Sequence, residues 1–283
     1  LSSNLLAEFV ASNANVVGVC TLASSSFNAD HCDLTPLAAA AGIPVIYADD
    51  INSNNTIKII SQWNPDIILC FGWSRLIRKP LLDIPPLGII GFHPAALPAN
   101  RGRHPIIWAL VLGLRKTAST FFFMDEGADS GDIISQEEVC IDFEDDASSL
   151  YNRVVDTALI QLRIFLPKLA KGSSQRMIQD EKLANAWRKR GPKDGLIDWR
   201  MSAESIYNLV RGLTMPYIGA EFETQGTIFK VWKVRVEDCI SDNLEPGKVL
   251  EATNNQPLIK AGVGAIRLLD FDQQITLQPG DYL

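Results

Sequence analysis

Two short stretches of the sequence gather residue types that suit acid–base chemistry. The first, GFHPAALPANRGRHP (91–105), contains His93 at the end of an apolar run, and three prolines stiffen the loop that follows it. The second, MDEGADSGDII (124–134), holds four carboxylic acids and two glycines within eight residues, a density that packing alone does not explain. Histidine exchanges protons near neutral pH, and a neighbouring carboxylate favours its charged form. A histidine–carboxylate pair is the chemistry that these stretches could supply.

The elements that must position His93 alternate between strand and helix. Apolar, β-branched runs with little alternation predict strands that are covered on both faces. The predicted strands are 15–22, 44–48, 66–72 and 86–93, and the predicted helices are 33–42, 54–63 and 104–114. This order predicts βαβ units in an α/β, Rossmann-like domain with a mainly parallel sheet. His93 then lies at the carboxyl end of a strand, where such sheets place their sites.

The second half of the chain has a different pattern. Two further strands, 117–124 and 132–141, flank the acidic turn, and an amphipathic helix follows over 147–171. After a polar connection, one helix at 202–213 and several strand-like pieces predict a small β-rich domain that resembles an open barrel. We therefore expect a catalytic domain, a linker and a C-terminal domain over 1–172, 173–192 and 193–283. Because the chain starts with helical spacing, we also expect the first strand of the sheet to be missing from it.

The two stretches resemble the folate-dependent formyltransferase family, which includes methionyl-tRNA formyltransferase and the amino-sugar N-formyltransferases. The resemblance rests on residues at fixed offsets, which here are His93, Leu97–Pro98, Arg101–Gly102, Pro105 and Asp129–Gly131. ILCFGWSRLI (68–77) resembles the strand and loop that hold folate in the family. DGLIDWRMSAESIYNLVRGLTMPYIGAEF (194–222) resembles the two-domain members, so the likeness covers nearly the whole chain.

This resemblance implies transfer of a formyl group from 10-formyltetrahydrofolate to an amine, without a metal ion. It implies that His93 stabilises the oxygen of the tetrahedral intermediate, and that Asp129 holds the imidazole and helps to remove the amine proton. For the folate site we predict Arg75, Ile77, Leu97, Pro98, Met124 and Glu126. Arg101 and Arg103 are predicted to meet a diphosphate of the acceptor, since guanidinium groups match phosphate geometry.

The sequence departs from the family at one position. Gly91 stands where the family has its catalytic asparagine, two residues before the histidine. In the family that amide helps to hold the formyl oxygen, and losing one such donor costs about 10²–10³ in rate. We therefore predict a substitute donor, with Asn100 as the first candidate and His104 or a water molecule as alternatives.

Composition and cysteine spacing exclude several classes of protein. Hydrophobic residues make up 47% and charged residues 21% of the 283 residues, which argues against a disordered or fibrous chain. The net charge of −7 disfavours broad binding to nucleic acid. The five cysteines form no CxxC pair, and the adjacent His31, Cys32 and Asp33 cannot all face one ion, so we expect no disulfide framework and no metal site. We expect a cytoplasmic protein that does not enter a membrane.

The amine acceptor has more than one candidate. From Gly191 to Leu283 there are nine Lys and Arg against thirteen Asp and Glu, whereas a domain that cradles tRNA should be basic. We therefore expect a nucleotide-linked amino sugar, with methionyl-tRNA as the alternative. A formyltetrahydrofolate hydrolase and a non-catalytic folate-binding module are further alternatives, but the latter predicts loss of His93 or Asp129, and both are present. A homodimer is one possible assembly of this chain.

Overall fold

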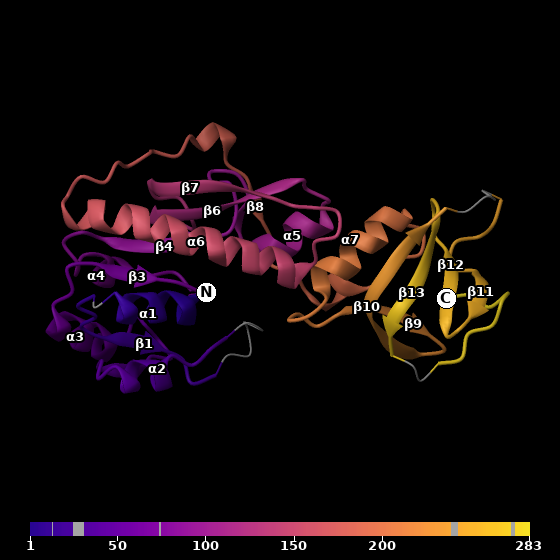
Figure 1. Ribbon diagram of the computed structural model, residues 1–283, viewed down its shortest axis with the longest axis horizontal. Coiled ribbons are helices and arrows are strands. Elements are labelled where there is room, and N and C mark those ends of the chain that lie inside the picture. The colour runs from indigo at the N-terminus through magenta and orange to yellow at the C-terminus, as the bar shows by residue number, and fades with distance from the viewer. Residues whose placement is uncertain (13, 25–30, 74, 239–242, 273–274) are drawn as a thin grey trace. The chain divides into compact units, whose positions relative to one another are not determined.

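The computed structural model describes the chain except for residues 13, 25–30, 74, 239–242 and 273–274 (Figure 1). The chain divides into two compact units, each made of three segments. The first unit comprises Leu1–Gly102, Ala118–Val139 and Arg153–Trp187. The second comprises Arg103–Thr117, Cys140–Asn152 and Arg188–Leu283. The expected domain borders at 172 and 192 stay a prediction.

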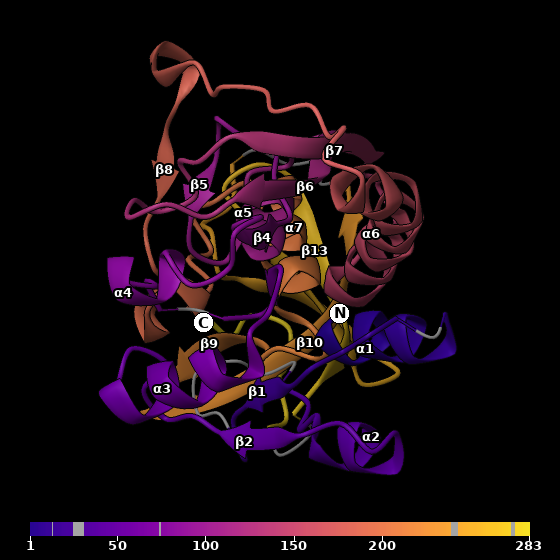
Figure 2. The same ribbon diagram turned by 90° about the vertical axis from the view of Figure 1, so that its left-hand side faces the viewer.

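The first unit is an α/β fold that contains two pairs of parallel strands (Figures 1 and 2). The strand β1 (Val19–Thr21) pairs with β2 (Val45–Tyr47), and β3 (Ile68–Cys70) pairs with β4 (Ile89–His93). The helices that alternate with them are α1 (Ser2–Ala11), α2 (Thr35–Ala40), α3 (Asn54–Trp63) and α4 (Lys79–Leu82). The α/β prediction is confirmed, and His93 is the last residue of β4, as expected.

Two later strands extend the β3–β4 pair into a four-stranded sheet in the order β3-β4-β6-β7. The strand β6 (Lys116–Phe123) runs antiparallel to β4, and β7 (Ile133–Cys140) lies beside it. This sheet is therefore mixed. The sequence did not indicate the direction of β6, because β4 and β6 are both buried apolar runs and burial alone does not encode strand direction. In Figure 1 the helix α6 (Ala147–Ala170) lies along this sheet, and its Leu162 and Phe165 pack with Ile90 and Phe121.

The polar segment that was expected to be a linker contains short regular elements. Its residues form the 3₁₀ turn η1 (Glu181–Leu183) and the strand β8 (Ala186–Trp187), and a second 3₁₀ turn, η2 (Pro192–Gly195), begins at its last residue. In the first unit, β8 pairs in parallel with β5 (Arg101–Gly102), which lies on the loop after His93. The segment thus returns to the stretch that carries the candidate catalytic residues.

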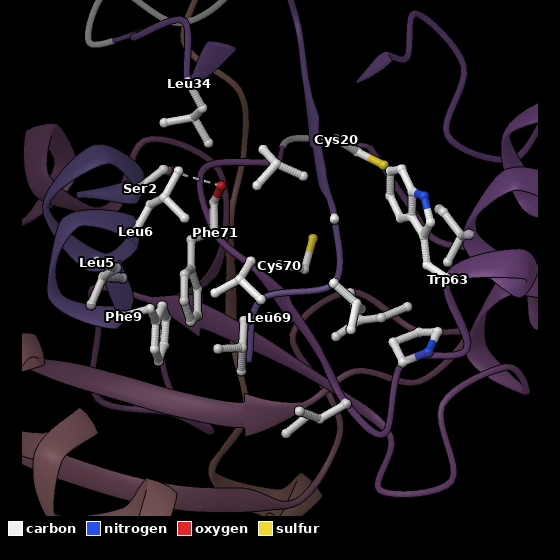
Figure 3. A pocket seen from close by; sticks show the side chains of 18 of the residues that line it. Ser2, Leu5, Leu6, Phe9, Cys20, Leu34, Trp63, Leu69, Cys70 and Phe71 are labelled. Carbon is white, nitrogen blue, oxygen red and sulfur yellow. Dashed lines mark hydrogen bonds between the residues drawn. The ribbon is translucent and has the colours of Figure 1, made fainter. Parts of the chain in front are cut away.

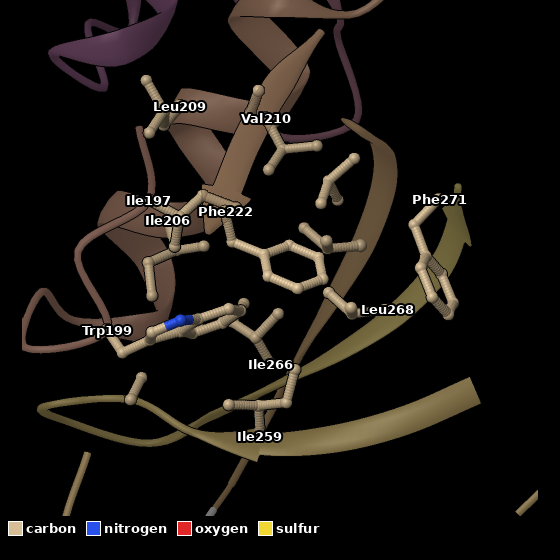
Figure 4. Packing of buried hydrophobic residues seen from close by; sticks show 14 of the residues in the cluster. Ile197, Trp199, Ile206, Leu209, Val210, Phe222, Ile259, Ile266, Leu268 and Phe271 are labelled. Atoms are coloured by element: carbon tan, nitrogen blue, oxygen red, sulfur yellow. The ribbon is translucent and has the colours of Figure 1, made fainter. Parts of the chain in front are cut away.

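The second unit is dominated by an antiparallel sheet of five strands in the order β11-β12-β13-β10-β9. The helices α5 (Pro105–Val111) and α7 (Ala203–Leu213) belong to the same unit. Trp199 and Phe222 pack edge to face with ring centroids 6.0 Å apart in its core (Figure 4). The prediction of a small β-rich domain is confirmed, with strands β9 (Ala220–Thr224), β10 (Thr227–Glu237), β11 (Val249–Thr253), β12 (Gln256–Lys260) and β13 (Ala265–Phe271).

Candidate active site

His93 is held by one ring nitrogen and faces a carboxylate with the other. The side chain is buried, with 4% of the residue exposed, and Nε2 donates to the main-chain oxygen of Asn100 at 2.7 Å. Because a carbonyl oxygen can only accept, Nε2 must carry the hydrogen. Nδ1 lies 3.6 Å from Oδ2 of Asp129, which is longer than a hydrogen bond. In the neutral ring, Nδ1 is therefore the nitrogen that can take up a proton.

Asp129 stands in an uncommon backbone conformation, with φ of 56° in the left-handed region. Its Oδ2 accepts a hydrogen bond from the main-chain N–H of Gly102 at 2.9 Å. The turn closes tightly two residues later, since a Cβ on Gly131 would lie 1.8 Å from the oxygen of Phe123. In the Asp-x-Gly pattern, position 131 is glycine because a larger side chain would clash with the main chain of Phe123. The aspartate at position 129 accepts a charge-assisted hydrogen bond from Gly102.

Asp125 shapes the same turn from its other end. Its Oδ1 accepts hydrogen bonds from the N–H of Gly127 at 2.9 Å and from the hydroxyl of Ser130 at 2.8 Å. Glu126, predicted for the folate site, is exposed on this turn. The acidic density of the stretch therefore has two origins, because Asp125 organises the turn while Asp129 faces the histidine.

Gly91 cannot simply be exchanged for the asparagine of the family. Residues 91 and 93 point to the same face of β4, since side chains alternate along a strand. Gly91 is directly opposite Phe122 on β6, and a Cβ at position 91 would lie 2.8 Å from the Phe122 ring and 2.9 Å from Cγ of Met124. Apolar atoms therefore occupy the space beside His93 that an asparagine side chain would need.

Of the predicted folate residues, two pack together in one apolar cluster. Leu97 and Met124 belong to an apolar cluster with Phe122 and Ile133. Pro98 follows Leu97 through a cis peptide bond. The main-chain oxygen of Leu97 accepts from the amide of Gln136 at 2.9 Å, which ties this loop to β7.

The other two predicted folate residues lie elsewhere. Ile77 is buried in a cluster with Ile60 and Leu81, and Arg75 donates to the main-chain oxygen of Asp49. Neither contact involves His93 or Asp129, so the structure does not join these two residues to the pair.

Arg101 is engaged within the protein. Its Nε and Nη2 donate to Oε1 of Gln179 at 3.2 and 2.7 Å, and its Nη1 and Nη2 donate to the carboxylate of Glu181 at 3.0 and 2.7 Å. The pKa of Arg101 is raised, first by the hydrogen bonds to Glu181. The structure thus gives Arg101 a part in holding the segment 179–181, and its contact with a phosphate stays a prediction.

Arg103 begins the second unit and directly follows Gly102 in the chain. Burial lowers the pKa of His104, and the charges of Arg103, Arg190 and Lys189 lower it further. In the same unit the Arg190 guanidinium lies 4.7 Å from the ring centroid of Trp108. The sequence motif AWRKR (186–190) was assigned to the linker, and two of its residues, Lys189 and Arg190, add positive charge near His104.

A cavity of about 320 Å³ lies in the first unit but does not include the pair (Figure 3). Its walls are mostly apolar and come from α1, α3, β1 and β3. Burial raises the pKa of the Cys20 and Cys70 thiols at its wall to about 11 and about 12. Ile77 lines this cavity, whereas His93 and Asp129 do not.

Among the residues outside the gaps named above, no three His, Cys, Asp or Glu side chains are grouped so as to hold a metal ion. Over the same part of the chain, no helix has both the length and the apolar character needed to cross a membrane.

The sequence matches two family models. Residues 11–162 match the model described as formyl transferase, and residues 190–278 match the model of the formyl transferase C-terminal domain. The bifunctional polymyxin resistance protein ArnA of Wigglesworthia glossinidia brevipalpis is 35% identical over 217 residues, which is 77% of this chain and 32% of that protein. The chain thus spans about a third of the length of this curated relative.

Solved structures share the fold at low identity. An N-formyltransferase from Helicobacter canadensis, in complex with folinic acid and dTDP-3-aminofucose, superposes with a TM-score of 0.71 at 15% identity and 94% coverage of both chains. Methionyl-tRNA formyltransferase from Clostridium thermocellum superposes with a TM-score of 0.60 at 20% identity, over 78% of this chain and 94% of that one. With family models matched in both halves, the resemblance seen in the motifs is confirmed, and the chain belongs to the formyl transferase family.

Proposed function

We propose that this protein transfers the formyl group of 10-formyltetrahydrofolate to the amine of a nucleotide-linked amino sugar. The observation that carries the proposal is the juxtaposition of His93 and Asp129, each held by a main-chain partner of its own. The Helicobacter canadensis N-formyltransferase, which shares the fold and was solved in complex with folinic acid and dTDP-3-aminofucose, supports this choice.

The reaction requires a neutral amine to attack the formyl carbon. A C–N bond to the acceptor forms, and the formyl oxygen gains negative charge in a tetrahedral intermediate. When that intermediate collapses, the bond to N10 of tetrahydrofolate breaks, the acceptor nitrogen loses a proton and N10 gains one. No covalent intermediate with the enzyme is needed, so the protein must position the reactants and move protons.

His93 and Asp129 suit these two tasks. Because Nε2 of His93 is committed to Asn100, the Nδ1 side of the ring is left for the reacting groups. Protonated at Nδ1, the ring stabilises the developing oxyanion, and the carboxylate 3.6 Å away stabilises the ring's positive charge. Asp129 Oδ2 keeps a hydrogen bond from Gly102, so the carboxylate stays in place while a proton passes from the amine.

The missing asparagine needs a substitute donor, and Asn100 remains our proposal. Its main-chain oxygen already lies 2.7 Å from Nε2 of His93, which places this residue beside the imidazole. Its φ of 65° is tolerated by asparagine better than by most residues. The side-chain amide would donate to the formyl oxygen as charge develops.

The proposal of a nucleotide-linked amino sugar as the amine acceptor rests on the charge of the C-terminal stretch. The C-terminal stretch is acidic, with thirteen Asp and Glu against nine Lys and Arg from Gly191 onward, which disfavours tRNA. Arg103, next in sequence to the Gly102 that binds Asp129, is the proposed contact for the acceptor's diphosphate. Methionyl-tRNA stays the second candidate, since the Clostridium thermocellum methionyl-tRNA formyltransferase shares the fold.

A turnover assay tests the proposal. The protein is incubated with 10-formyltetrahydrofolate and a panel of amines that includes UDP- and dTDP-linked amino sugars and methionyl-tRNA, and release of tetrahydrofolate is followed. Formylation of a nucleotide sugar is expected. Formylation of methionyl-tRNA alone would identify methionyl-tRNA as the acceptor, and release of formate without an acceptor would identify the protein as a hydrolase. Folate binding with no turnover on any amine would refute the proposal that the protein is a formyltransferase.

A further inference from the structure

We infer that Gln179 is a positioning residue that holds Asp129 in place opposite His93, an inference that rests on the function proposed above. Gln179 lies in the polar segment far from either residue in sequence, and it is buried, with 6% of its surface exposed. Buried glutamine is uncommon unless its amide is fully bonded. We therefore expect both the nitrogen and the oxygen of its amide to form hydrogen bonds within the protein.

The amide nitrogen of Gln179 binds the acidic turn at two points. Nε2 donates to the main-chain oxygen of Asp129 at 2.9 Å and to that of Gly131 at 2.7 Å. These two oxygens bracket the turn, so one side chain fixes its curvature at the residue that carries the carboxylate. Asp129 needs such support, because its φ of 56° lies in the left-handed region, which non-glycine residues adopt uncommonly.

The amide oxygen of Gln179 binds the loop after His93. Oε1 accepts from Nε and Nη2 of Arg101, and Arg101 is the residue before Gly102, whose N–H donates to Asp129 Oδ2. Gln179 therefore closes a ring of contacts in which the side chain of Asp129 is bound by Gly102 and its main chain by Gln179. The orientation of the amide is unambiguous, because only NH₂ can donate to carbonyls and only oxygen can accept from a guanidinium.

Arg101, the member of this ring that binds the Gln179 oxygen, is itself held by Glu181 and by the pairing of β5 with β8. Glu181 forms a two-pronged ion pair with Arg101, and the N–H of Arg101 donates to the oxygen of Asn185 at 3.0 Å. Arg101 is thus held on two sides and presents a fixed fork to Gln179. The polar segment 179–187 acts as a clamp on the proposed catalytic pair rather than as a passive connection.

Two substitutions separate the halves of the Gln179 amide. Gln179→Met removes all four hydrogen bonds at similar volume. Gln179→Glu, when ionised, still accepts from Arg101 but cannot donate to Asp129 and Gly131. The matched control is Gln161→Met, because Gln161 is also buried in the first unit and binds the oxygen of Ser119 and the hydroxyl of Ser135 instead.

Two readouts decide the inference. Both Gln179 variants should lower kcat at least tenfold while KM for 10-formyltetrahydrofolate changes less than threefold, since misplacing a reacting group by about 1 Å can cost 10² in rate. In NMR spectra, the amide proton of Gly102 should shift in both variants and not in Gln161→Met. Wild-type kcat and an unmoved Gly102 signal in folded Gln179 variants would overturn the inference. The Gly102 signal needs no turnover, so an inactive wild type would count against the proposed function and leave this test intact.

Discussion

The main-chain N–H of Gly102 donates to Oδ2 of Asp129 at 2.9 Å, and this bond joins the loop after β4 to the acidic turn between β6 and β7. Through it, the residue that follows Arg101 sets the direction of the carboxylate that faces His93. The stretches 91–105 and 124–134, which are separate in sequence, are thereby joined in one candidate site.

Removing either member of the pair should abolish most of the turnover. His93→Ala and Asp129→Asn are each expected to lower kcat by at least about 10², because proton transfer and charge stabilisation are both lost. Steady-state kinetics with 10-formyltetrahydrofolate and the accepted amine measure the effect. Asp132→Asn, a change to another acid of the same turn, serves as the control and should retain kcat within about threefold. Equal losses at Asp129 and Asp132 would contradict a specific role for Asp129.

The role of the Asn100 side chain can be separated from that of its main chain. Asn100→Gly keeps the left-handed backbone and the carbonyl that binds His93, and it removes only the side-chain amide. If the amide is the substitute donor, kcat should fall about 10². Rates within threefold of wild type would discard Asn100 as the donor and leave His104 or water.

Adding a side chain at position 91 should destabilise the fold. Gly91→Asn is expected to lower the free energy of unfolding by about 1–3 kcal/mol, because the new atoms overlap Phe122 and Met124 in a packed cluster. Urea unfolding followed by circular dichroism measures the change. Gly191→Ala is the control, since no atom lies within 4 Å of a Cβ built there, and it should leave stability nearly unchanged. A Gly91→Asn variant as stable as the control would show that the cluster yields easily.

Acid should weaken the second unit through Glu237. Hydrogen bonds from Arg267 lower the pKa of Glu237 to about 2, whereas an ordinary glutamate has a pKa of 4.5. The carboxylate is therefore stabilising above pH 4.5, and that contribution is lost as the pH falls from about 4.5 towards 2. Urea unfolding at several pH values should show a loss of about 1–2 kcal/mol, reduced from the full linkage value because the pair is partly exposed.

Two variants test the assignment to Glu237. Glu237→Gln should flatten the stability profile below pH 4.5, whereas Glu223→Gln, an exposed position on β9, should leave its slope intact. A Glu237→Gln variant with the wild-type slope would assign the acid sensitivity to other carboxylates.

The cysteines should differ sharply in reactivity. The thiolate is the reactive form, and burial raises the pKa of Cys20 to about 11 and that of Cys70 to about 12, while Cys32 and Cys140 are exposed. Treatment with iodoacetamide at pH 8 should therefore modify Cys32 and Cys140 before Cys20 and Cys70, as read by peptide mass spectrometry. Modification of Cys70 as fast as Cys32 would mean that the cavity wall opens readily.

Local signals made parts of the fold predictable. The helix α3 has the predicted bounds because Ser53 caps its first turn by accepting from the N–H of Thr56, and Asn64 ends it in the left-handed region. The place of His93 at the end of a strand was predictable because an apolar run ends at this residue. The strand at 117–124 was predicted, but the sequence pattern does not encode strand direction, so the antiparallel pairing of β6 with β4 was not anticipated.

The contacts of the segment 179–187 could not be predicted from local pattern. The strand β8 has only two residues, too few for any periodicity, and it pairs with residues 85 positions earlier in the chain, as Asn185 does with Asn100. Gln179 sits among polar residues that suggest a solvated linker, and only the folded chain shows its four hydrogen bonds. Burial of a polar side chain is a tertiary property, and single-sequence patterns do not record it.

The filled space beside His93 has a consequence for how this chain can change over evolution. An asparagine at position 91 must coexist with Phe122 and Met124, so its effect depends on what stands at those two positions. Substitutions at the three positions are therefore expected to be non-additive, and an asparagine at position 91 should cost less stability when a smaller side chain stands at 122 or 124.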